Sequence, residues 1–271
     1  MWNPYERLSP PQRRVLGIAS VALVLVAWSV ITALDLVSPA RLPSPGAVSE
    51  AFARLAWDAE YGALPSAITS SPLLDDTLWS LMRVFVAGLL VIVIGIPIGV
   101  LMGASPRINA ALSPMVDPFR SAPVVALLPI LVMWLGIGET LKIAFLFIGA
   151  VVFLVPMVRD AMLAVPQEHW ILARDLGATP FEAVTRAVLP MARPRIMDAI
   201  TVATSVMWTY ITVAEFTNAR EGLGAFITNA KRFSATDQMF VGIFVIIALA
   251  LITHAILVGL KKRLYPWEAE V

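Results

Sequence analysis

Long apolar runs are the feature that most restricts how this chain can fold. A helix needs about 20 predominantly apolar residues to cross the hydrocarbon core of a bilayer. Because lipid offers no partners to backbone N–H and C=O groups, such runs must form helices. The sequence therefore predicts an all-α polytopic membrane protein with about six transmembrane helices. The predicted spans are Val15–Leu34, Leu78–Met102, Phe119–Leu135, Thr140–Met162, Ile196–Phe216 and Gln238–Leu260.

Composition agrees with the spans. Of the 271 residues, 59% are hydrophobic and only 14% are charged, whereas a soluble domain is about half apolar and a quarter charged. The first run is longer than the apolar core of a signal peptide and lacks a convincing cleavage site, so we interpret it as a retained span. We expect an N-terminal tail, first span and outer loop over 1–77, a transmembrane core over 78–262 and a C-terminal tail over 263–271.

Several kinds of chemistry are not indicated by the sequence. The chain has no cysteine, which excludes disulfides and thiol catalysis, and its only two histidines, His169 and His254, are far apart in sequence and do not suggest a zinc site. No G-x-x-x-x-G-K-[ST] or G-x-S-x-G motif is present. The net charge is +1, without a basic cluster. We therefore expect a non-catalytic chain without metal, cofactor or nucleic acid.

The longest polar interruption in the second half is Val165–Pro194. A first short helix is expected from about Pro166 to Leu176, because proline is well tolerated at a helix start. Gly177 takes the C-terminal position that glycine fills most easily. The segment is therefore predicted to turn sharply at Gly177.

A second short helix should follow this turn. Thr179 can cap it, with Pro180 in its first turn and Glu182 three residues after the cap, as in a capping box. We expect this helix to end near Leu189-Pro190. A helix-turn-helix between membrane spans is a surface suited to contact with another protein.

The spacing in this segment resembles a known signature. After Gly177, nine residues lead to Ala187-Val188-Leu189-Pro190. This is similar to the EAA signature of ABC-importer permeases, in which Glu-Ala-Ala, three residues, glycine and nine residues precede Ile-x-Leu-Pro. In those proteins the segment is the coupling helix, which docks on the ATP-hydrolysing subunit.

The match to the signature is partial. The Glu-Ala-Ala positions hold Ile171, Leu172 and Ala173, and Ala187 replaces the isoleucine. Glu168, Arg174 or Asp175 could supply the missing polar contact, and an ordinary amphipathic loop helix remains the alternative. The resemblance implies that the ATPase subunit contacts Ile171, Leu172, Ala173, Arg174, Asp175, Gly177, Ala178, Leu189 and Pro190.

Other stretches also resemble this family, and the first of them resembles its branch that handles nitrate, sulfonates, taurine and bicarbonate. Leu42-Pro43-Ser44-Pro45 precedes a short expected helix at Pro45–Trp57, which should lie on the membrane surface. The third apolar run is proline-broken and ends in a Trp-x-Gly-x-Gly pattern at Trp134–Gly138. A Gly-Leu-Gly follows the fifth span at Gly222–Gly224, within an expected outer loop over 218–237.

Two segments are candidates for a translocation pathway. Prolines in a membrane helix are tolerated where the helix lines a cavity or the protein interior. The proline-broken third run is therefore a candidate pathway wall, with Pro123, Pro129 and Met133 as its candidate residues. Polar residues of the fifth span recur every three or four positions, on one helix face. These are Thr201, Thr204, Ser205, Trp208, Thr212 and Glu215.

Glu215 is the most informative member of this stripe. An acidic group inside a span is costly and usually functional. Alternatively, it lies near the outer interface, wet or paired with Arg220, and the threonines simply hydrogen-bond within the bundle. A carboxylate lining the pathway would repel an anion, so either Glu215 is not pore-lining or the substrate carries a neutral or cationic part.

The second span carries Gly95, Gly99 and Gly103 at intervals of four. This spacing lets two membrane helices approach closely, and it predicts a packing face. Pro97 is expected to kink the same helix, and Arg83 and Arg107 are taken as flanking residues.

Charge distribution predicts the orientation. Placing both termini in the cytoplasm puts most of the 20 lysines and arginines inside, as the positive-inside rule requires. The segment Val165–Pro194 then lies in the cytoplasm, where an ATPase subunit would be. The outer side receives only Arg41, Arg54, Arg83, Lys142, Arg220, Lys231 and Arg232.

The resemblance implies a permease subunit of an ATP-driven importer in a bacterial inner membrane, carrying a small and mainly anionic solute. Its implied partners are a second copy of this chain, two ABC ATPase subunits that bind ATP and Mg²⁺, a periplasmic or lipid-anchored solute-binding protein and the bilayer. An ATP-independent secondary transporter or channel is the main alternative, although no clear internal repeat supports it. A structural subunit that scaffolds an enzyme is a third.

Overall fold

The computed structural model describes residues 9–57, 72–217 and 220–268. The predicted tail residues 1–8 and 269–271, and the part of the outer loop at 58–71, lie outside this description. The described residues form helices joined by short turns. In chain order the α-helices are α1 (Pro10–Ala33), α2 (Pro45–Trp57), α3 (Pro72–Ala104), α4 (Pro106–Val116), α5 (Leu128–Leu135), α6 (Glu139–Leu163), α7 (Gln167–Asp175), α8 (Pro180–Ala183), α9 (Leu189–Phe216), α10 (Leu223–Arg232) and α11 (Thr236–Leu264).

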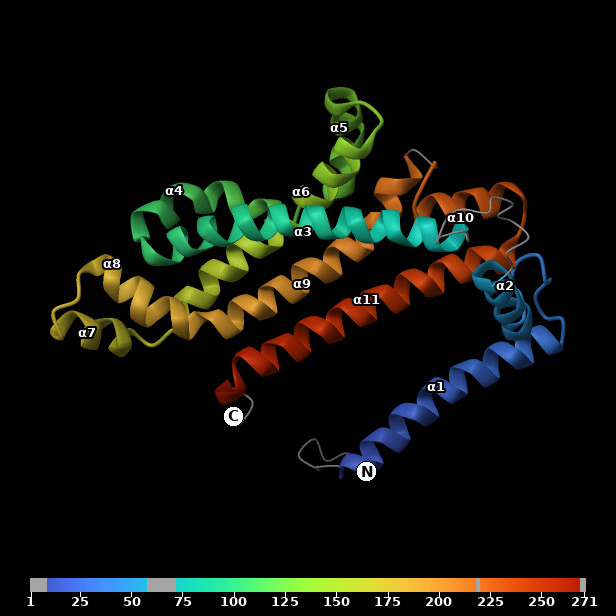
Figure 1. Cartoon of the computed structure of the whole chain (residues 1–271), viewed down its shortest axis with the longest axis horizontal. Helices are drawn as coiled ribbons and strands as arrows, with labels where there is room; N and C mark the ends of the chain where they lie inside the picture. The colour runs from blue at the N-terminus through green and yellow to red at the C-terminus, as the bar shows by residue number, and fades with distance from the viewer. Residues whose placement is uncertain (1–8, 58–71, 218–219, 269–271) are drawn as a thin grey trace.

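The long helices α3, α6, α9 and α11 run along the molecule, with α7 and α8 at one end and α2 and α10 at the other (Figure 1). Among the described residues, five helices are long and apolar enough to cross a membrane. A sixth crossing results if the pair Pro106–Arg120 and Val124–Leu135, bent by 96°, counts as one broken span. The prediction of an all-α polytopic fold is confirmed.

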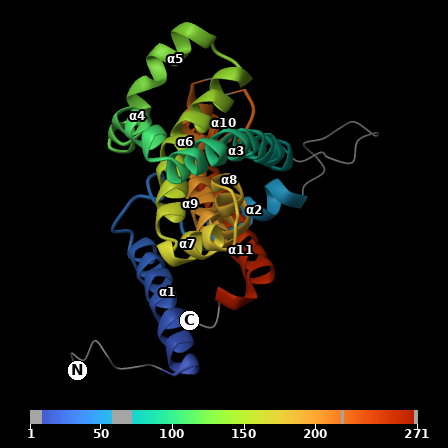
Figure 2. The same cartoon turned by 90° about the vertical axis from the view of Figure 1, so that its left-hand side faces the viewer.

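Helix α1 lies at the edge of this bundle (Figure 2) and exposes apolar side chains along most of its length. It is attached near its C-terminal end. Trp28 stacks on Phe240 of α11 with ring centroids 5.9 Å apart, and its indole nitrogen donates to the carbonyl of Pro43 at 3.0 Å. An apolar surface of this kind suits a helix that is surrounded by lipid.

The glycine stripe of α3 packs against α6. A Cβ atom built on Gly95 would lie 3.0 Å from Leu154, one on Gly99 would lie 2.6 Å from the Cβ of Val158, and one on Gly103 would lie 2.5 Å from the Cβ of Met162. The partners on α6 also recur every four residues, so the two helices meet along matching rows. The predicted packing face is confirmed.

Replacing Gly99 with valine should separate α3 from α6. The added side chain would overlap Val158 and the carbonyl of Val155, and overpacking of this kind typically costs about 1–3 kcal/mol. We expect a lower midpoint of thermal unfolding in detergent. Gly17→Val in α1 is the matched control, because a Cβ there meets nothing within 4 Å. An unchanged midpoint in Gly99→Val would contradict the packing interpretation.

Two expected loops contain helices instead. The stretch Ala104–Pro118, which lies between the second and third predicted spans, holds α4, because Ser105 caps it by accepting from the N–H of Ile108 and Pro106 occupies its first turn. The outer loop over 218–237 holds α10, whose apolar residues are buried at helical spacing.

The second helix of the polar segment does not end at Leu189-Pro190 as predicted. Helix α8 continues through a π-helical turn at Val184–Val188 directly into α9. A proline inside a helix removes one backbone donor and clashes with the preceding turn. The wider π turn before Pro190 relieves this conflict, so the helix continues into the membrane.

Candidate functional site

The turn between α7 and α8 is built by local backbone chemistry. Gly177 has φ of +90°, a left-handed conformation that glycine adopts at little cost. Its N–H donates to the carbonyl of Arg174 at 3.0 Å, and the N–H of Ala178 donates to Ala173 at 3.0 Å. This is a Schellman motif, which satisfies the last carbonyl groups of α7.

The second half of the turn is a complete capping box. The N–H of Glu182 donates to the Thr179 hydroxyl at 3.3 Å, and the Thr179 N–H donates to the Glu182 carboxylate at 3.0 Å. Glu182 also pairs with Arg186 at 3.3 Å. Because both ends of the turn are capped, the angle between α7 and α8 is defined by residues within the segment.

The tip of this segment is apolar and exposed. Leu176 is 80% exposed and Phe181 is 76% exposed, and Ile171 and Leu172 are exposed beside them. Helix α7 has no buried residue. An apolar patch on a polar segment outside the membrane is typical of a protein contact. Of the residues expected to contact an ATPase, Arg174, Asp175 and Gly177 are also exposed, Ala173 and Ala178 are half-buried, and Leu189 and Pro190 are half-buried at its base.

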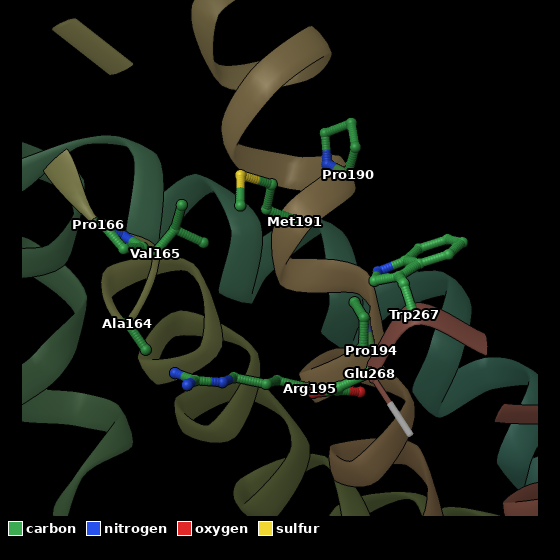
Figure 3. A pocket seen from close by; sticks show the side chains of 9 residues that line it. All are labelled: Ala164, Val165, Pro166, Pro190, Met191, Pro194, Arg195, Trp267 and Glu268. Atoms are coloured by element: carbon green, nitrogen blue, oxygen red, sulfur yellow. The ribbon is translucent and has the colours of Figure 1, made fainter. Parts of the chain in front are cut away.

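A cavity of about 480 Å³ lies at the base of the segment (Figure 3). The C-terminal turn Pro266–Glu268 closes one side of the cavity, and Lys261 holds this turn through contacts to Asp198 at 2.7 Å and Glu268 at 3.0 Å. The cavity therefore lies between the two ends of the polar segment Val165–Pro194. The lining residues are Ala164, Val165, Pro166, Pro190, Met191, Pro194, Arg195, Trp267 and Glu268.

The broken helix stands outside the layer of long helices. Helix α5 projects from the bundle on the side away from α1 (Figure 2). Its inner face packs Leu131 against Leu141 and Phe145 of α6. Pro123, Pro129 and Met133 are each exposed in the single chain.

The polar stripe of α9 is divided in the structure. Thr201, Trp208 and Glu215 are buried within the chain, Thr204 and Thr212 are half-buried, and Ser205 is exposed beside Thr209. Trp208 donates to the hydroxyl of Thr253 on α11 at 2.9 Å. The threonine and serine hydroxyl groups of the stripe donate to carbonyls one turn back in α9. Only part of the stripe therefore faces away from the bundle, and its role as a pathway wall stays a prediction.

Glu215 lies in a charge cluster. It is fully buried and pairs with Arg83 at 2.7 Å, and not with Arg220, the partner that the alternative interpretation named. One carboxylate oxygen accepts from the hydroxyl of Ser80 at 2.7 Å, and the other accepts from the N–H of Gly224 at 2.7 Å. Every face of the carboxylate is thus occupied by protein.

Side chains next to this ion pair also cap the N-terminus of α10. The N–H of Gly222 donates to Asp76 at 2.7 Å and the N–H of Leu223 donates to Ser80 at 2.9 Å. The first N–H groups of a helix have no partner within it, and negative charge there is favourable. Side chains of α3 and α9 therefore provide the N-terminal cap that the sequence around α10 lacks.

Arg83 is the residue that the sequence interpretation placed wrongly. It was taken as a flanking residue on the outer side, but it lies inside α3 and is fully buried. A charge within an apolar run is costly and marks a functional or paired site. The rule that drew attention to Glu215 would also have identified Arg83.

Comparison with known proteins places these features in a family. The family described as "Binding-protein-dependent transport system inner membrane component" matches residues 95–265. The taurine transport system permease protein TauC of Escherichia coli (strain K12) is 32% identical over 271 residues, covering 97% of this chain and 93% of the relative. The putative aliphatic sulfonates transport permease protein SsuC of Bacillus subtilis (strain 168) is 27% identical, covering 93% of this chain and 87% of the relative.

Solved structures agree with this similarity. A chain of the inward-facing MetNI methionine ABC transporter is 25% identical with a TM-score of 0.63, covering 71% of this chain and 95% of that chain. A second crystal form is 27% identical with a TM-score of 0.60, covering 71% and 94%. The family match includes α5, the α7–α8 segment and α9. This chain belongs to the binding-protein-dependent transport system inner membrane components, the non-catalytic permease subunits of ABC importers.

Proposed function

We propose that this permease carries a small sulfonate of the taurine type across the inner membrane. The observation that supports this most strongly is the similarity to TauC, which extends over 97% of the chain. The similarity to the sulfonate permease SsuC covers 93% of it. A substrate class shared by two relatives over nearly the whole chain is the best available guide to the solute.

The environment of Glu215 removes an objection to an anionic solute. A lone carboxylate in the pathway would repel a sulfonate. Both the Glu215 and the Arg83 side chains are 0% exposed, and they pair at 2.7 Å. The carboxylate is therefore neutralised and covered, so it presents no free negative charge to a passing anion.

The proposed assembly has two copies of this chain, two ABC ATPase subunits and a solute-binding protein outside. The exposed apolar residues Ile171, Leu172, Leu176 and Phe181 support docking of the α7–α8 segment on the ATPase. ATP and Mg²⁺ would be bound by that partner. The segment carries Arg174, Arg186 and Arg193, and by the positive-inside rule these support its placement in the cytoplasm together with both chain termini.

We further propose that a second copy closes the pathway against the open faces of α5 and α9. Met133 on α5 and Ser205 and Thr209 on α9 are exposed in the single chain. Polar groups in a membrane helix normally face protein or water rather than lipid. Pairing of two copies would enclose these residues around a central passage.

Transport then follows from a two-state bundle. Closure of the ATPase pair would draw the two α7–α8 segments together and tilt the spans from inward-open to outward-open. Solute released by the binding protein would enter the passage, and ATP hydrolysis would restore the inward-open state. The capped turn at Gly177 would transmit this movement, because a compliant turn would absorb it.

The test is reconstitution of the permease with the ATPase encoded beside it, in lipid nanodiscs. We expect a stable complex whose ATP turnover rises when binding protein loaded with taurine is added. The same binding protein without solute is the control. A chain that purifies without an ATPase and moves solute without ATP would overturn the importer interpretation, and stimulation only by a solute without a sulfonate would overturn the substrate class.

A further inference from the structure

Four charged residues from three helices form a network of ion pairs at the end of the molecule opposite α7. Arg83 of α3 donates to both oxygens of Glu139 on α6, at 2.6 and 2.8 Å, and to Glu215 of α9 at 2.7 Å. Lys142 of α6 donates to Glu139 at 2.9 Å. Two cations thus face two carboxylates, and charge-assisted contacts this short are strong.

The cluster has a closed half and an open half. In the closed half, the side chains of Arg83 and Glu215 are both fully buried. In the open half, the Glu139 side chain is 40% exposed although its partners Arg83 and Lys142 are buried. Breaking the buried pair would leave charges without water, whereas Glu139 can leave Arg83 and become hydrated.

Glu139 is placed where its movement would matter. It is the first residue of α6 and follows the link Gly136–Gly138 from α5. Gly136 has φ of +69°, and neither Gly136 nor Gly138 has a neighbour within 4 Å of a built Cβ. This link is therefore free of side-chain contacts at both glycines, and the contact of Glu139 with Arg83 ties the start of α6, where the link ends, to α3.

The same arginine also holds α10. Arg83 donates to the carbonyl of Glu221 at 2.9 Å, directly before the Gly222 turn that begins α10. A Cβ on Gly222 would clash with the guanidinium of Arg83 and the carboxylate of Glu215. One guanidinium therefore connects the α5–α6 link with the start of α10.

We propose that the Arg83–Glu139 contact is the releasable half of a latch that keeps the outer end of the permease closed. Arg83 and Glu139 act as positioning residues for transport, and the buried Arg83–Glu215 pair is the fixed anchor. The proposal rests on the proposed importer function. The latch stabilises the inward-facing state, and release by liganded binding protein lets the α5–α6 link move away from the start of α10.

The sharpest test removes the contacts made by Glu139 without changing the net charge of the chain. The double substitution Glu139→Gln with Lys142→Met deletes one carboxylate and one cation and leaves Arg83–Glu215 intact. Glu139→Gln alone would leave the buried Lys142 unpaired, so any loss of folding in the single variant should be recovered in the double variant.

In the reconstituted complex, we expect the double variant to raise basal ATP turnover roughly fivefold or more, a typical size for coupling between sites. Turnover with liganded binding protein should change little, so the stimulation ratio should fall. Arg54→Gln is the control, because it removes an ion pair to Asp237 whose arginine side chain is 63% exposed and should leave both rates unchanged. Unchanged basal turnover in the double variant would overturn the latch.

A distance measurement on the permease alone separates this proposal from the importer function. The chain has no native cysteine, so spin labels at Ile137→Cys in the α5–α6 link and Phe233→Cys at the end of α10, both exposed positions, report the separation of the link from α10 specifically. Dilution with unlabelled chain removes distances between copies. We expect a longer or broader distribution in the double variant, and an identical narrow distribution would refute the latch even where no ATPase stimulation is seen.

Discussion

Replacing Arg83 with leucine is expected to eliminate most of the folded permease. The change leaves the fully buried Glu215 without its cation and leaves Glu139 paired with Lys142 alone. Removing one partner of a buried ion pair costs about 3–5 kcal/mol, which is a large part of a typical stability of about 5–15 kcal/mol. The measurements are the yield of monodisperse protein after extraction and the midpoint of thermal unfolding in detergent.

Two variants control this experiment. Arg83→Lys keeps the charge but cannot contact Glu139 and Glu215 through a planar fork, so its midpoint should lie between those of the wild type and Arg83→Leu. Arg54→Leu breaks the exposed pair with Asp237, which is worth at most about 1 kcal/mol. A stable Arg83→Leu protein would show that the cluster contributes little to folding.

Replacing Gly177 with valine is expected to uncouple ATP hydrolysis from transport. A Cβ at this position meets nothing within 4 Å, so steric clash is not the cause. The backbone has φ of +90°, which a β-branched residue tolerates poorly. Strain of about 1–3 kcal/mol would favour another turn geometry and redirect α7.

The comparison that isolates this effect is Gly177→Asn, because asparagine adopts left-handed conformations more readily. We expect Gly177→Asn to retain substrate uptake per ATP hydrolysed and Gly177→Val to lose most of it, with both chains inserted at normal levels. Uptake and ATP turnover should be measured in the same proteoliposomes. Normal coupling in Gly177→Val would disprove a mechanical role for the turn.

Where local chemistry was sufficient, the sequence interpretation agreed with the structure. The capping box of Thr179 and Glu182 and the left-handed Gly177 depend on residues within a few positions of each other, and both were predicted. The spans were predicted from run length, because the bilayer sets that length whatever the helices pack against. The role of Gly95, Gly99 and Gly103 followed from spacing alone.

Where a residue's partner is distant in sequence, the sequence predicted the wrong environment for the residue or did not predict its partner. Arg83 and Glu215 are 132 positions apart, and no spacing rule connects them. Helix α10 takes its cap from Asp76, Ser80 and Glu215 on other helices, so no local signal marked its start.

The sequence alone thus determined that this chain is a helical membrane protein, where most of its spans lie, and how the α7–α8 turn is capped. These properties depend on the length of the apolar runs and on residues close together in the chain, and both can be read from the sequence. Only the tertiary structure decided that Glu215 is an anchored and neutralised charge, that α8 continues past Pro190 into α9, and that the start of α6 is linked to the start of α10 through Arg83. Those outcomes depend on which helices pack together, because a buried charge must find its partner across the interface between them.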